Sequence, residues 1–162
     1  MGCATAIAGS SEYEVKAAYV YNFAKFIDWP SSESAADVTI CVYGKDPFGG
    51  FLDEAVRGKL AHGLPLAIRR LPTGSESWEG CQVLFLGMKN AARVEPILRR
   101  LEGRSILTIA ELDGFAEGGG MLGLRFDGGT VRFDINLAAI AAARLQASSR
   151  LIEIGRVVGP RK

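Results

Sequence analysis

The sequence predicts a single-domain α/β protein with a mixed, partly parallel sheet of about six strands and helices on both faces. The chain of 162 residues has the size of one domain, and no break in composition suggests a linker. Short uncharged runs rich in β-branched residues alternate with segments of helical period, which is typical of strands buried on both faces. The last third differs, because it predicts a C-terminal antiparallel hairpin.

The first predicted element is a helix. Ser11 and Glu14 have the spacing of a capping box, so we expect the helix to run from Ser11 to about Trp29, where Pro30 ends it. Its apolar stripe should face the core. The residues of that stripe are Val15, Ala18, Tyr19, Asn22, Phe23, Phe26 and Ile27.

The middle of the chain alternates strands and helices. Residues 38–43 predict a buried strand, after which Asp46 and Pro47 suit the start of a helix that reaches about Val56. Further strands are expected at 64–71, 82–86 and 105–109, and a helix at 91–101.

The C-terminal third begins with the hairpin. Its strands, 121–126 and 131–135, are joined by a tight turn at Asp127-Gly128-Gly129. Asn136 can cap a helix over 137–145, and Ser148 or Ser149 can cap another that reaches Val157. We therefore assign residues 11–158 to the domain, 1–10 to a leader remnant or disordered segment, and 159–162 to a tail.

Composition and charge exclude several classes of function. The formal net charge is +1, so no strong field attracts nucleic acid or an anionic membrane. His62 is the single histidine, which argues against a histidine-rich zinc site and a Ser-His-Asp triad. The chain contains neither of the glycine-rich phosphate-binding motifs, GxxxxGKS and GxGxxG. Together with the single histidine, this means that no catalytic residue, metal or cofactor is expected.

Four segments together carry a resemblance to a known family. They are Tyr19–Pro30 (YVYNFAKFIDWP), Ile40–Gly49 (ICVYGKDPFG), Cys81–Leu86 (CQVLFL) and Val131–Leu137 (VRFDINL), the last followed by Ser148–Leu151 (SSRL). In this order they resemble the YfiR family of secreted bacterial regulators. The combination of the first and fourth segments makes the resemblance specific.

The resemblance implies a periplasmic, non-enzymatic regulator. A well-studied member of the family represses a membrane-bound diguanylate cyclase by binding its periplasmic part, and an OmpA-like outer-membrane lipoprotein sequesters that repressor. The output is cyclic-di-GMP, which drives biofilm formation. Related domains also occur beside sensor kinases, so a periplasmic small-ligand sensor that feeds a histidine kinase is the alternative. A homodimer is also expected, because signalling partners of this type are often two-fold.

Candidate partner or ligand residues fall into two groups. Tyr21 and Trp29 lie near the edges of the aromatic helix, where exposed rings suit a binding hot spot. The second group combines arginine forks, which suit carboxylates and phosphates, with neighbouring polar residues. Its members are Arg132, Asn136, Arg150, Glu153 and Arg156. A structural ion pair between Arg150 and Glu153 is the alternative for that pair.

Two loops follow buried strands, at 44–46 and 87–90. Ligands of open α/β sheets bind at such carboxyl ends, so these loops are where a small ligand would be sought. Ordinary connecting loops are the alternative, and the sequence favours them.

The cysteines permit one candidate disulfide. No cysteine follows Cys81, unlike in the best-known family member, so redox control through a C-terminal bridge is in doubt. An oxidising periplasm permits a bridge between Cys41 and Cys81. If both strands end level at their glycines, however, the two positions lie roughly 10 Å apart along the strands, beyond the ~7 Å that a bridge spans. The bridge and a free buried thiol both remain open.

Overall fold

The computed structural model describes residues 3–30, 35–74 and 77–159, with side chains from residue 12 onward. Its main sheet contains β2 (Val38–Gly44), β3 (Leu60–Ala61), β4 (Leu64–Leu71), β5 (Val83–Gly87), β6 (Leu107–Ala110), β7 (Leu122–Asp127), β8 (Thr130–Ile135) and β10 (Arg156–Val157). The strand order is β10-β8-β7-β6-β5-β2-β4-β3. A second, small sheet pairs β1 (Ile27–Asp28) with β9 (Gln146–Ala147). The mixed α/β fold predicted from the sequence is confirmed, and its six expected strands are the six long ones.

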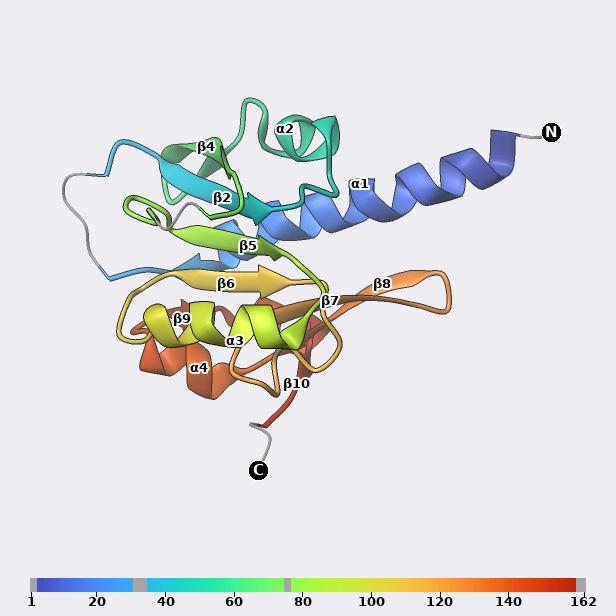
Figure 1. The fold of residues 1–162 in the computed structure, drawn as a ribbon. Coiled ribbons are helices and arrows are strands. Elements are labelled where there is room, and N and C mark those ends of the chain that lie inside the picture. The colour runs from blue at the N-terminus through green and yellow to red at the C-terminus, as the bar shows by residue number, and fades with distance from the viewer. Residues whose placement is uncertain (1–2, 31–34, 75–76, 160–162) are drawn as a thin grey trace.

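Helices cover both faces of the main sheet (Figure 1). They are α1 (Cys3–Phe26), α2 (Gly50–Val56), α3 (Ala91–Arg100), α4 (Leu137–Ala142) and α5 (Ser149–Ile154). One core lies under α1, α2, α4 and α5, around Phe23, Phe85 and Phe133. The second core lies under α3, around Cys41, Leu84 and Val94. Successive residues of β2 and β5 therefore enter opposite cores, which explains why both strands are uninterrupted apolar runs.

The connections that follow β2 and β5 lead in opposite directions across the sheet. The connection from β2 leads through α2 to β4 on one side, whereas the connection from β5 leads through α3 to β6 on the other. All four strands are parallel, and β2 and β5 end level with each other, because Gly44 lies opposite Gly87. Parallel sheets bind ligands at the carboxyl ends of such a switch point.

Several element boundaries differ from the sequence prediction. Helix α1 begins at Cys3 rather than Ser11 and ends at Phe26, where β1 takes over. Residues 3–10 continue this helix, whose N-terminal end extends past the sheet in Figure 1. The assignment of residues 1–10 to a leader remnant stays a prediction.

The predicted start of the second helix is also wrong. Asp46 accepts a hydrogen bond from the Phe48 amide at 2.8 Å, which makes a local turn, and α2 begins only at Gly50. The last helix ends at Ile154 instead of Val157. Gly155 follows it, packed so closely on Phe133 that a Cβ atom would lie 2.4 Å from the ring.

The predicted core stripe of α1 is rotated. Val15 and Ala18 are exposed, and the buried residues between positions 12 and 26 are Lys16, Ala17, Val20, Phe23 and Ala24. Apolar and small residues occur on every side of this helix, so periodicity alone does not fix the buried face. Contacts such as that between Phe23 and Phe133, with ring centroids 4.9 Å apart, decide it.

Candidate functional site

A buried carboxylate joins β7, β8 and β10 at one edge of the sheet. Asp134 is only 4% exposed, and its Oδ1 accepts hydrogen bonds from Nε of Arg125 at 3.2 Å and of Arg156 at 2.8 Å. The hydrogen bonds and charge of Asp134 hold the pKa of Arg156 above its ordinary value. Arg156 was predicted as a partner anchor; its guanidinium binds Asp134, and its side chain is 59% exposed.

We expect Asp134→Ala to lower the free energy of unfolding by about 2 kcal/mol, because it removes charged hydrogen bonds to two arginines. Urea unfolding measures the effect. Asp127→Ala is the matched control, since this carboxylate is 66% exposed and pairs with Arg125 at 3.4 Å. The control should change stability by less than ~0.5 kcal/mol. Equal losses in the two variants would contradict a special role for Asp134.

Asn136 has a structural role that excludes it from a binding surface. It is buried, its Oδ1 accepts from the Ala139 amide at 3.0 Å, and its Nδ2 donates to the Ala116 carbonyl at 2.7 Å. The first bond caps α4, as the sequence predicts, and the second holds the turn that precedes β7. A partner does not reach this side chain.

The remaining residues of the predicted group are exposed. Arg132 lies on β8 opposite Arg125, whereas Arg150 and Glu153 lie on α5. Within the described part of the chain no ion pair joins Arg150 to Glu153, so that structural alternative is wrong. Two large hydrophobic residues lie on the same short segment: Ile154 is 61% exposed and Val157 is 51% exposed. We call Arg150, Glu153, Ile154 and Val157 the C-terminal surface.

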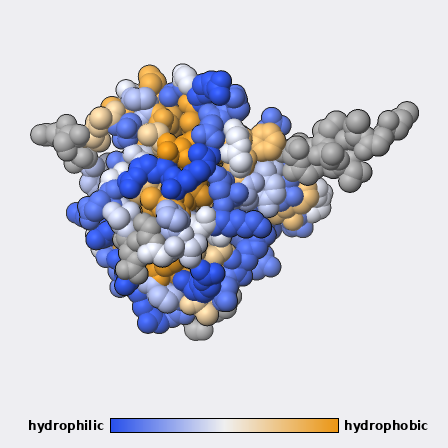
Figure 2. All heavy atoms as spheres, turned by 45° about the horizontal axis from the view of Figure 1, so that its top comes forward, coloured by the Kyte–Doolittle hydropathy of each residue, from blue (hydrophilic) through white to orange (hydrophobic). Residues whose placement is uncertain are grey.

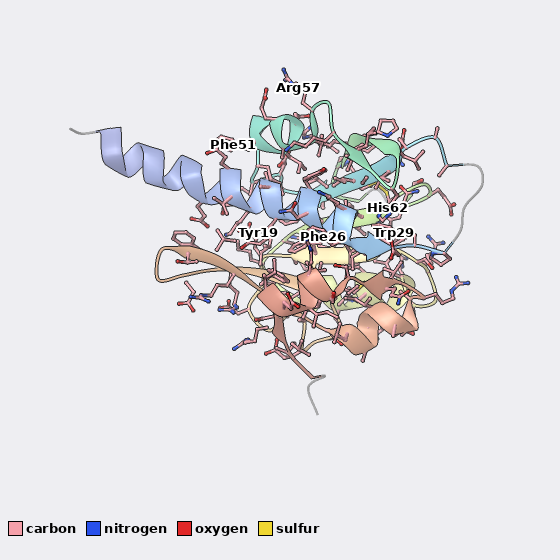
Figure 3. All side chains as sticks on the ribbon, turned by 180° about the vertical axis from the view of Figure 1, so that it is seen from behind. Tyr19, Phe26, Trp29, Phe51, Arg57 and His62 are labelled. Atoms are coloured by element: carbon pink, nitrogen blue, oxygen red, sulfur yellow. A yellow bond between two sulfur atoms is a disulfide. The ribbon has the colours of Figure 1, made fainter. Side chains whose placement is uncertain are left out.

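The two aromatic candidates at the other sheet edge make internal contacts. Tyr21 donates from its hydroxyl to the Leu60 carbonyl at 3.3 Å. Trp29 donates from Nε1 to the Gln82 carbonyl at 3.2 Å, and its ring packs edge-on against His62. Figure 3 shows Trp29 and His62 together at the end of α1. Both aromatic side chains are half-buried, so they connect α1 to the sheet and expose only part of their rings.

Figure 2 brings the α2 and β4 side of the molecule toward the viewer. Hydrophobic residues form a strip there among hydrophilic ones. Strand β4 belongs to this side and has half-buried Leu64, Leu66 and Ile68, followed by exposed Arg69 and Arg70. Charged residues on an outer strand discourage edge-to-edge association.

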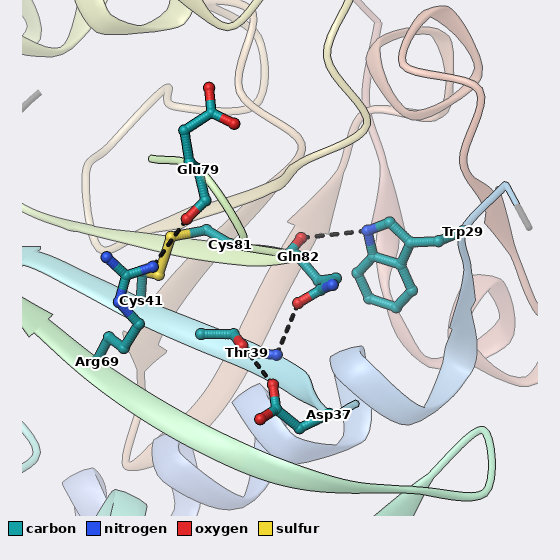
Figure 4. Close-up of a disulfide and its surroundings, with 8 residues drawn as sticks. All are labelled: Trp29, Asp37, Thr39, Cys41, Arg69, Glu79, Cys81 and Gln82. Carbon is teal, nitrogen blue, oxygen red and sulfur yellow. Dashed lines mark hydrogen bonds between the residues drawn. A yellow bond between two sulfur atoms is a disulfide. The ribbon is translucent and has the colours of Figure 1, made fainter. Parts of the chain in front are cut away.

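A disulfide joins Cys41 to Cys81 with a Cα–Cα distance of 5.9 Å (Figure 4). The strand register is the one that the sequence argument assumed, since Cys41 pairs with Leu84. The inferred separation was wrong because Cys81 precedes β5 and lies in a turn, where its amide donates to the Trp78 carbonyl at 3.1 Å. Beside the bridge, Gln82 Oε1 accepts from the Thr39 amide at 2.7 Å.

A pocket of about 610 Å³ lies at the carboxyl ends of β2 and β5. Its lining residues are Tyr13, Lys45, Asp46, Pro47, Phe85, Leu86, Gly87, Met88, Lys89 and Glu111. It includes both loops that the sequence marked as ligand positions. The volume falls within the range of about 300–1,000 Å³ that is usual for small-molecule sites.

Beside this pocket, α1 carries a buried ion-pair cluster that the sequence analysis missed. The Lys16 side chain is 4% exposed, its Nζ donates to Glu12 at 2.6 Å, and it also donates to Glu111 beyond the end of β6. Burial alone would lower the pKa of Lys16, but its bonds to Glu111 and Glu12 outweigh burial and raise that pKa. Lys16 between Val15 and Ala17, one turn after Glu12, was the signal that could have revealed the cluster.

Comparison with protein families identifies the chain. Among the described residues, no helix is both long and apolar enough to span a membrane, and no three His, Cys, Asp or Glu residues gather as a metal site. A family model described as YfiR/HmsC-like matches residues 13–156. The match spans most of the 162 residues and all long strands of the main sheet. The chain therefore belongs to the YfiR/HmsC-like family.

Proposed function

We propose that this protein is a periplasmic regulatory binding protein that controls an inner-membrane diguanylate cyclase by protein–protein contact. The family match over residues 13–156 is the observation that carries the proposal. The Cys41–Cys81 bridge supports the location, since structural disulfides persist in oxidising compartments such as the periplasm. In this scheme the protein represses the cyclase without catalysing a reaction itself, and an OmpA-like outer-membrane lipoprotein releases the cyclase by sequestering it.

We place the contact with the cyclase on the C-terminal surface. Ile154 and Val157 expose large hydrophobic side chains next to the charged Arg150 and Glu153. Protein interfaces combine buried apolar anchors with a polar rim, and this segment offers both. A homodimer that leaves this surface accessible fits a two-fold cyclase.

Deletion of the gene tests the proposed function. Cells without the protein should contain more cyclic-di-GMP and attach more strongly to surfaces, because the cyclase is no longer repressed. Complementation with the wild-type chain should restore both readouts. Unchanged cyclic-di-GMP and attachment in the deletion strain would contradict the proposal.

Charge insertion tests the contact surface. Ile154→Glu with Val157→Glu should weaken binding to the purified periplasmic part of the cyclase by about tenfold or more, because two apolar anchors are lost. Leu60→Glu is the matched control: Leu60 is 57% exposed at the opposite edge of the sheet. Pull-down or calorimetry gives the affinities. If only Leu60→Glu abolishes binding, the contact lies instead at the β3 edge of the sheet, near Tyr21.

The second candidate is a periplasmic small-ligand sensor that feeds a histidine kinase. The pocket at the switch point between β2 and β5 favours it, because small-molecule sites of open α/β sheets occur there. The two functions differ in a measurable way. A sensor changes its effect on the receptor when ligand is added, whereas a simple protein repressor acts at the same strength in dialysed and undialysed samples.

A further inference from the structure

We propose that the pocket at the carboxyl ends of β2 and β5 binds a small organic anion: an apolar group that carries a phosphate or a carboxylate. Lys45 and Lys89 hold the anionic group, and the apolar group lies against Tyr13, Pro47 and Met88. This inference goes beyond the control of a cyclase by protein contact and is independent of it. It gives the ligand-sensing alternative a site and a ligand chemistry.

The shape of the pocket follows from Gly87, at the end of β5. A Cβ atom on Gly87 would lie 1.8 Å from the Lys45 carbonyl oxygen, so only glycine lets the two loops approach this closely. The Lys45 amide donates to the Gly87 carbonyl at 3.2 Å and fixes one loop against the other strand. Beyond this contact the chains separate toward α2 and α3, which leaves the cavity between them.

The walls of the pocket are largely apolar. Phe85 is buried at its base and packs edge-on against Phe48 with centroids 4.8 Å apart. Met88 is buried as well, while Tyr13 and Pro47 are half-buried along the rim. Ring and thioether side chains that are already packed lose little conformational entropy when an apolar group covers them.

The charges in the lining favour an anion over a cation. Asp46 accepts from Nε of Arg70 at 2.6 Å, and Glu111 accepts from the buried Lys16, so each carboxylate of the lining already has a cationic partner, which it shares with Asp53 and Glu12, respectively. Lys45 and Lys89 are exposed at the pocket and form no ion pair with any described residue. These two lysines are therefore the charges of the lining that remain available to an incoming ligand, and they favour an anion. The N-terminus of α3, which directly follows the Lys89 loop, adds to this potential.

Titration of the purified full chain with phenyl phosphate at about 0.15 M salt, where exposed charges are screened, tests the proposal. Isothermal titration calorimetry should show saturable one-site binding with Kd of about 1 mM or tighter, the range for so small a ligand. Inorganic phosphate should bind at least about tenfold more weakly because it lacks the apolar group. Phenylacetate shows whether a carboxylate replaces the phosphate.

Paired lysine variants locate the site. Lys45→Ala with Lys89→Ala should weaken phenyl phosphate binding about tenfold or more, since both cations are removed. Lys25→Ala with Lys59→Ala removes the same charge from exposed lysines elsewhere and should leave binding unchanged. Thermal unfolding should show that both variants fold.

Three results would overturn the proposal: no saturable binding up to ~10 mM phenyl phosphate, unchanged binding in the pocket variant, or equal weakening in both variants. Because the titration uses the isolated chain, its failure leaves the cyclase contact untouched. A failed cyclase pull-down likewise leaves the pocket untouched.

Discussion

Replacement of both Cys41 and Cys81 by alanine should lower the free energy of unfolding by about 4 kcal/mol. The bridge closes a loop across a sequence separation of 40 residues, and the entropy that such a loop removes from the unfolded chain corresponds to this amount. Both cysteines are buried in the core under α3, so a folded variant also leaves a small cavity. Urea unfolding of the oxidised wild type and the variant measures the difference.

Reduction provides the control for the disulfide. A reductant should destabilise the wild type to nearly the level of the double-alanine variant and should leave that variant unchanged. The start of β5 should loosen first, because Gln82, next to Cys81, holds the Trp29 indole and the Thr39 amide. Equal stability of oxidised and reduced wild type would contradict a stabilising bridge.

Lys16→Met should lower the free energy of unfolding by about 3 kcal/mol. The Glu111 side chain is 9% exposed, so removal of the cation leaves a buried carboxylate without a partner. Methionine keeps most of the volume and the apolar contacts of the lysine stem. Lys25→Met, on the exposed side of the same helix, is the matched control and should change stability by less than ~0.5 kcal/mol.

The cluster also predicts a pH dependence. The bonds to Glu111 and Glu12 raise the pKa of Lys16 against the opposing effect of burial. Because the pKa of Lys16 is raised in the folded state, its ion pairs stabilise the protein fully at pH values below the unfolded-state pKa of 10.5. This stabilisation is lost as the pH rises through the folded-state pKa of Lys16. The stability gap between wild type and Lys16→Met should therefore be constant near neutral pH and shrink in alkali. A gap that widens above pH 10.5 would contradict this assignment.

Tyr13 titrates in the same alkaline range. Burial, together with the charge of Glu111, raises its pKa, so the folded state favours the neutral phenol. Its contribution is likewise lost as the pH rises, in the wild type and in the variant. The charge of Lys16 lowers the pKa of Tyr13, so Lys16→Met also shifts the titration of Tyr13. The comparison isolates the lysine when Tyr13→Phe is present in both chains.

The candidate site shows where sequence reasoning works. The two loops after β2 and β5 were marked from strand endings alone, because parallel strands place their carboxyl ends at one edge. The sequence did not reveal that Glu111, far along the chain, lies beside Lys16. Nor did it reveal that Asp134 binds two arginines, because that contact depends on the short parallel pairing of β10 with β8.

Local chemistry was enough to determine the fold class, the six long strands, the hairpin turn and the family. Uninterrupted apolar runs, Gly and Asp at turns, and conspicuous segments such as FIDWP are properties of neighbouring residues. Only the tertiary structure decided which face of α1 is buried, whether Cys41 reaches Cys81, and which arginines are free to bind a partner. Those outcomes depend on contacts between distant segments, where a turn at Cys81 or two residues of β10 move a side chain by several ångströms.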